Sequence, residues 1–191
     1  MNQEPRPRRS SSPSSPRTEV DPFKLGFMVF ISIYGFIGLI NYESLWFLHN
    51  FDLIIHEAGH AIFRIFGEFI QFLGGTLMQL LVPIGIAVYF FFNQQNFEGG
   101  ITLFWIAVNL LDISRYMKDA RSQELPLLGG ELVTHDWWYL FSKMNLLAHD
   151  KAIGGFVHFL GFLIYGLAVF VGFYHAWHSP RPQPPEPPEE Q

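Results

Sequence analysis

Residues 69–92 read FIQFLGGTLMQLLVPIGIAVYFFF and contain no Asp, Glu, Lys or Arg. The stretch 152–180 is equally free of these four residue types. A helix needs about 20 apolar residues to cross the hydrocarbon core of a bilayer, so each stretch is long enough for one span. Residues 25–41 form a third charge-free run and residues 99–111 a shorter fourth. The sequence therefore predicts an all-α, polytopic membrane helix bundle.

Between its two ends the chain divides into about five expected transmembrane helices. They cover approximately residues 23–41, 44–66, 69–92, 100–117 and 152–177. Residues 118–151 are expected to form a loop region with short helices at most. The alternating pattern of a membrane β-barrel is absent, which leaves helices as the spanning element.

Both ends of the chain have compositions that cannot bury a core. Residues 1–20 are rich in Pro, Ser and Arg, and residues 179–191 are acidic and rich in Pro. Such segments are predicted to be disordered tails. Residues 21–178 then form a single membrane-embedded domain.

The Lys and Arg residues predict the orientation, because cytoplasmic loops carry an excess of them. If the N-terminus is cytoplasmic, five spans leave only Arg181 on the outer side. After the N-terminal tail, the residues that then lie on the cytoplasmic side are Lys24, Arg64, Arg115, Lys118, Arg121, Lys143 and Lys151.

Two features of the composition exclude classes of function. The chain has no cysteine, so it has no disulfide, no thiolate metal site, no iron–sulfur cluster and no thiol nucleophile. It carries a net charge of -5 and no basic stripe with interleaved aromatic residues, so nucleic acid is not an expected partner.

The second expected span, residues 44–66, is unusually polar for a membrane helix. It reads SLWFLHNFDLIIHEAGHAIFRIF. Ionisable groups within a span usually face the interior of the bundle and mark function. The polar residues follow steps of three, four, four and four, which places them along one face of a helix. They are His49, Asp52, His56, His60 and Arg64.

Within this face, residues 56–60 form the motif H-E-x-x-H. His56 and His60 lie one helical turn apart and can both bind one Zn²⁺ at about 2.0–2.1 Å. Glu57 can act as the general base that removes a proton from a water molecule. Asp52 is expected to accept the other N–H of the His56 ring, and Gly59 to leave open space beside the metal.

At these residues the chain resembles the site-2-protease-like intramembrane zinc metallopeptidases, in particular an uncharacterised bacterial branch. The resemblance implies that His56, Glu57 and His60 form the catalytic site of a metalloendopeptidase. It implies an Asp as third zinc ligand, a protein or peptide substrate in the lipid bilayer, and a location in the bacterial inner membrane. It covers about residues 50–150.

The third ligand has four candidates. The family motif is an Asp followed by Gly, often after Asn-Pro, and Asn109-Leu110-Leu111-Asp112 lacks both the Pro and the Gly. A salt bridge with the neighbouring Lys118 or Arg121 is the simpler role for Asp119. Asp136 has no cation close in sequence and precedes two Trp, so it is preferred. Asp112, Asp119 and His135 remain as alternatives.

Residues 74–83 also resemble a segment of related bacterial membrane proteins. Gly74 and Gly75 favour close helix packing and Pro83 a kink. The alternative, functional interpretation of this segment is that Gln79 hydrogen-bonds an extended substrate.

Three other functions fit parts of the sequence. A b-type haem protein would use His56 or His60 together with His158 from the last span, which then faces the same cavity. A non-catalytic zinc-binding membrane adaptor would keep the metal without turnover. A zinc hydrolase of lipid amides or esters would use the same chemistry on another substrate.

Overall fold

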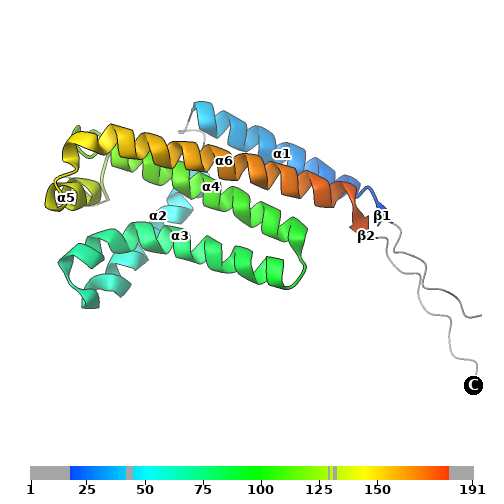
Figure 1. Cartoon of the computed structure of the whole chain (residues 1–191), viewed down its shortest axis with the longest axis horizontal. Helices are drawn as coiled ribbons and strands as arrows, with labels where there is room; N and C mark the ends of the chain where they lie inside the picture. The colour runs from blue at the N-terminus through cyan, green and yellow to red at the C-terminus, as the bar shows by residue number, and fades with distance from the viewer. Residues whose placement is uncertain (1–17, 42–44, 129, 131–132, 181–191) are drawn as a thin grey trace, which may run out of the picture.

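The computed structural model describes residues 18–41, 45–128, 130 and 133–180. Four long helices dominate it: α1 (Pro22–Ile40), α3 (Glu68–Phe92), α4 (Asn96–Lys118) and α6 (Asp150–Trp177). Figure 1 shows α4 packed along α6, with α1 on the other side of α6 and α3 beside α4. The predicted all-α helix bundle is confirmed.

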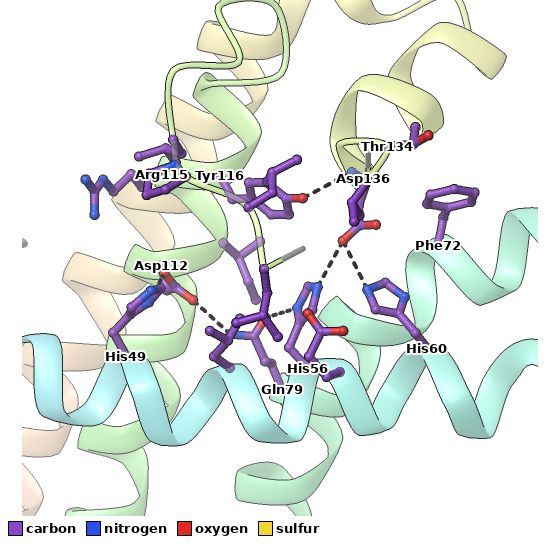
Figure 2. Close-up of a pocket in the computed structure, with 18 of the residues that line it drawn as sticks. His49, His56, His60, Phe72, Gln79, Asp112, Arg115, Tyr116, Thr134 and Asp136 are labelled. Carbon is purple, nitrogen blue, oxygen red and sulfur yellow. Dashed lines mark hydrogen bonds and ion pairs between the residues drawn. The ribbon is translucent and has the colours of Figure 1, made fainter. Parts of the chain in front are cut away.

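Within the described part of the chain, four helical segments are long and apolar enough to cross a membrane, by length and composition. They correspond to α1, α3, α4 and a segment over Leu147–Trp177 that contains α6. The remaining predicted span is also a helix, α2 (Trp46–Phe63), continued by the 3-10 turn η2 (Arg64–Phe66). It does not join the other four, because its ionisable residues lower its hydropathy. Figure 2 shows α2 crossing α4 steeply rather than running parallel to it.

The faces of α2 match the predicted polar column. Asp52 and His56 are buried, whereas Ile54 is 70% exposed and Ile62 is 50% exposed. A helix that turns its polar face inward and its apolar face outward is typical of a membrane bundle. The polar face is directed at α3 and α4, which makes α2 the element that carries functional groups into the bundle.

The residues of the loop region over 118–151 that the structure describes form only short helices, as predicted: α5 (Asp136–Lys143) and the 3-10 turn η4 (Leu147–His149). α5 begins at Asp136 and packs against α3 and α4. The long helices therefore place this short helix above the polar face of α2.

The inner ends of the two predicted disordered tails are ordered. β1 (Thr18–Glu19) pairs antiparallel with β2 (Ser179–Pro180). The backbone N–H of Asp21 donates to the Ala176 carbonyl at 3.0 Å, which holds the start of α1 against the end of α6. The Asp21 side chain also caps α1. These contacts bring β1 and β2 together. The rest of the two predicted tails, residues 1–17 and 181–191, lies outside the described residues.

Candidate metal centre

His56, His60 and Asp136 converge in space although α2 and α5 are far apart in sequence. Asp136 Oδ2 lies 2.9 Å from His56 Nε2 and 3.2 Å from His60 Nε2. The ligand atoms of the three residues all lie within 4.8 Å of one another. Figure 2 shows the two rings on α2 pointing at the carboxylate at the start of α5. Among the described residues, these form the one His/Asp/Glu group of this kind.

The spacing of these donors fits a tetrahedral ion. Ligand atoms at the usual zinc distance of about 2.0–2.1 Å stand about 3.3 Å apart at the corners of a tetrahedron. The two Nε2–Oδ2 distances of 2.9 and 3.2 Å are close to that edge length. Two imidazoles and one carboxylate form a donor set that suits zinc and leaves a fourth position for a substrate or water.

Each imidazole is held by a hydrogen bond from its other nitrogen. His56 Nδ1 donates to Gln79 Oε1 at 2.7 Å, and His60 Nδ1 donates to the Gln71 carbonyl at 2.7 Å. Such bonds fix the ring orientation and keep a proton on Nδ1. Nε2, which contacts the Asp136 carboxylate, is then the nitrogen that would give up its proton to bind a metal. The prediction that Asp52 accepts a hydrogen bond from the His56 ring is wrong. The carboxylate of Asp52 instead accepts from Trp105 Nε1 at 2.7 Å, because α4 brings that N–H within reach.

The hydrogen bonds continue from Gln79 to α4. Gln79 Nε2 donates to Asp112 Oδ2 at 2.9 Å, and His49 Nδ1 donates to Asp112 Oδ1 at 3.0 Å. Asp112, one of the four candidate ligands, is therefore linked to the ring of His56 through Gln79. Both the oxygen and the nitrogen of the Gln79 side-chain amide have hydrogen-bond partners inside the protein. The structure therefore does not show Gln79 turned toward a substrate.

Asp136 is positioned by its place at the start of α5. Its backbone N–H donates to the Tyr116 hydroxyl at 3.1 Å, and His135 Nδ1 caps the helix by accepting from the Trp138 N–H. Burial alone would raise the pKa of the Asp136 carboxyl, but hydrogen bonds with His56 and His60 outweigh it, so the net pKa is lowered. The carboxylate is thus anionic and suited to a cation.

Asp119 and His135, the two other candidate ligands, hold the loop instead. Asp119 accepts from the N–H groups of Glu124 and Leu125 at 2.9 and 3.1 Å and from the Ser122 hydroxyl at 2.8 Å. Its carboxylate also lies 3.4 Å from His135 Nε2. The predicted salt bridge of Asp119 with Arg121 is wrong, because Arg121 pairs with Asp150.

Arg121 pairs with Asp150 at the start of α6. Its Nη2 lies 2.6 Å from Asp150 Oδ1 and its Nε donates to Oδ2 at 2.9 Å. Because Asp150 is fully buried, this pair ties the loop to the bundle. Asp119 is thereby left to organise the backbone that follows α4.

A cavity of about 740 Å³ opens beside the three donors. Glu57, the predicted general base, lines it together with His56 and Asp136. Apolar residues also line it, among them Leu53, Phe72, Leu125, Pro126, Leu127 and Leu128. His158 is not among the described residues that line this cavity, which is the position that the haem alternative requires of it. The reason is that α6 packs on α4 rather than on α2.

Three glycines bring α2 and α3 into contact at the site. A Cβ atom on Gly59 would collide with the Gly74 carbonyl, and one on Gly74 would meet Phe63 Cβ at 2.7 Å. The packing interpretation of Gly74 is confirmed. The open space expected beside Gly59 is wrong, because the backbone of α3 fills it. A Cβ atom on Gly75 would collide with the His56 ring.

Comparisons with family models, curated proteins and solved structures found no match to this chain.

Proposed function

We propose that the chain is an intramembrane zinc metallopeptidase of the site-2-protease-like kind, which hydrolyses peptide bonds in membrane-associated proteins. The observation that carries the proposal is the convergence of His56 Nε2 and His60 Nε2 on one oxygen of Asp136, beside a cavity that Glu57 lines. The same three residues would hold the metal as His-His-Asp ligands.

The donor set supports zinc by its chemistry. Two imidazoles offer nitrogen and a carboxylate offers oxygen, and both ring Nδ1 atoms are already engaged. When bound, a zinc ion supplies a Lewis acid that polarises a carbonyl and lowers the pKa of water toward neutrality.

The residues of the chain would do the remaining work. Glu57 follows His56 directly and takes the proton of the attacking water as general base, then returns it to the leaving amine. The apolar wall of residues 125–128 excludes bulk water and contacts the apolar side chains of a membrane segment. The cavity of about 740 Å³ is large enough for a short unwound stretch rather than for a whole helix.

The setting of the site supports a substrate within the membrane. The cavity lies among helices long and apolar enough to span a bilayer. We propose the bacterial inner membrane, with the N-terminus cytoplasmic, from the resemblance and the Lys/Arg distribution.

A haem protein is less well supported. An Asp136 oxygen lies 2.9 and 3.2 Å from the Nε2 atoms that would face the iron. That contact leaves no room for a macrocycle against either ring.

The test is cleavage of a membrane-spanning reporter by purified protein in detergent. Glu57→Gln should abolish cleavage and retain zinc, because the residue acts on water and not on the metal. Glu124→Gln is a matched control, since Glu124 is exposed and is not among the residues that line the cavity. Retained turnover in Glu57→Gln would overturn the mechanism. Zinc binding without cleavage of any peptide or lipid reporter by the wild type would indicate the adaptor function.

A further inference from the structure

We infer that Asp112 and Gln79 are positioning residues that determine which nitrogen of His56 faces the metal. The inference rests on the metal-binding part of the proposed function. It adds a role for a hydrogen-bonded chain that runs from α2 through α3 to α4 and back to α2 (Figure 2).

The argument starts at the carboxylate. An ionised carboxylate only accepts hydrogen bonds, so the group of Gln79 that faces Asp112 at 2.9 Å must be its amide nitrogen. The amide oxygen then points the other way, toward His56 Nδ1 at 2.7 Å. An amide oxygen only accepts, so Nδ1 must carry the proton.

The proton on Nδ1 decides the chemistry of the ring. When a metal binds, Nε2 releases the proton that it shares with Asp136 Oδ2 at 2.9 Å. The neutral ring then keeps its one proton on Nδ1 and directs the Nε2 lone pair at the metal. If the amide of Gln79 turned over, its N–H would face Nδ1. The proton would then belong on Nε2, which cannot bind a metal while it carries one.

These hydrogen bonds are buried, so the orientation of the Gln79 amide depends on its protein partners. Gln79 is 3% exposed and the side chain of His56 is 8% exposed, so water has little access to replace a lost partner. His49 contributes a second donor to Asp112 from the pocket side, where its side chain is 37% exposed. The orientation of one buried amide is therefore set by the carboxylate on α4.

The test is a square of four proteins: wild type, Gln79→Glu, Asp112→Asn and the double variant. Gln79→Glu places two carboxylates face to face. Asp112→Asn places two amides face to face and lets Gln79 turn over. In the double variant the new amide at position 112 donates to the new carboxylate at position 79, whose second oxygen accepts from His56 Nδ1.

The measurement is the zinc dissociation constant from competition with a chelator. Each single variant should bind zinc about 10- to 100-fold more weakly. The double variant should recover most of this loss, whereas independent positions would make the two losses multiply. Multiplied losses in the double variant, or unchanged affinity in either single variant, would overturn the inference.

Asp52→Asn is the matched control, because it is the same chemical change at a fully buried Asp. Asp52 accepts from Trp105 and has no part in the hydrogen bonds that link His56, Gln79 and Asp112. Its zinc affinity should equal that of the wild type. If a single variant does not fold, ¹⁵N NMR of zinc-loaded wild type decides the question. It should show zinc on His56 Nε2 and a proton on Nδ1, and the reverse assignment would overturn the inference.

The outcomes separate the two proposals. A wild type that binds no zinc overturns the proposed function and this inference with it. A wild type that binds zinc, combined with losses that simply multiply, overturns only the role of Asp112 and Gln79.

Discussion

Gly75 on α3 lies directly against the imidazole of His56 on α2, so closely that a Cβ atom there would collide with the ring. The nearest ring atom is Nε2, the atom that also faces Asp136. The site thus depends on a residue that contributes no donor, because only a missing side chain leaves this volume to the histidine.

Gly75→Ala should displace the His56 ring and weaken zinc binding by about tenfold or more, a loss typical of disturbed ligand orientation. Zinc content and chelator competition measure the effect. Gly85→Ala is the matched control on the same helix, since no atom lies within 4 Å of its Cβ position. That variant should keep the affinity of the wild type. An equal loss in both variants would trace the effect to α3 as a whole instead of to the ring.

Under the proposed function, removal of zinc should destabilise the protein, because a metal held by His56, His60 and Asp136 would join α2 to α5. A ligand at 100 times its dissociation constant adds about 2.7 kcal/mol to the free energy of unfolding. Thermal unfolding with zinc and with a chelator should therefore differ in the wild type, and Asp136→Asn should remove the difference. Asp119→Asn should preserve it, because Asp119 holds the loop. The opposite pattern would make Asp119 the ligand.

Tyr116→Phe should loosen the start of α5, because it removes the hydroxyl that accepts the Asp136 N–H at 3.1 Å. A buried N–H left without a partner costs about 1–3 kcal/mol. We expect a lower unfolding temperature and weaker zinc binding. Tyr139→Phe is the comparison, since its hydroxyl donates to Glu68 in an exposed bond, and it should change both quantities little. Unaltered zinc affinity in Tyr116→Phe would show that the hydroxyl does not position Asp136.

The loop after α4 should loosen in acid through Asp119. Burial alone would raise the pKa of Asp119, but hydrogen bonds from the Glu124 N–H, Ser122 and the Leu125 N–H outweigh it, and the net pKa is lowered. A carboxyl with a lowered folded pKa stabilises the fold above its unfolded pKa of about 3.9, and the contribution is lost as the pH falls through the folded value. Amide hydrogen exchange at Glu124 and Leu125 should show less protection in acid. Asp119→Asn should remove this pH dependence, and a pH dependence that persists in the variant would assign it to another group.

Much of the fold follows from the sequence, because charge-free runs and helical spacing are local signals. The helix ends agree with the expected ranges to within a few residues, and α2 has the polar face that the spacing predicts. The absence of a cation close in sequence favours Asp136 among the four ligand candidates. The structure places its carboxylate beside both histidines.

Other features depend on contacts between helices and have no local signal. Asp52 stands one turn before His56, yet Trp105 from α4 takes its carboxylate. The contact of Gln79 with Asp112 joins residues 33 positions apart, and that of His49 with Asp112 joins residues 63 apart. The packing of α2 on α3 likewise has no local signal, because it depends on Gly59 of one helix meeting Gly74 of the other.

The split of the candidate donors between α2 and α5 has a consequence for biosynthesis. His56 and Asp136 are separated by 80 positions, which a ribosome covers in roughly 4 to 16 s at about 5–20 residues per second. During that interval the nascent chain carries both histidines without the carboxylate. Under the proposed function, an unfinished chain would be inert toward the other proteins being inserted around it. The docking of α5 would then complete the metal site and activate the newly synthesised enzyme.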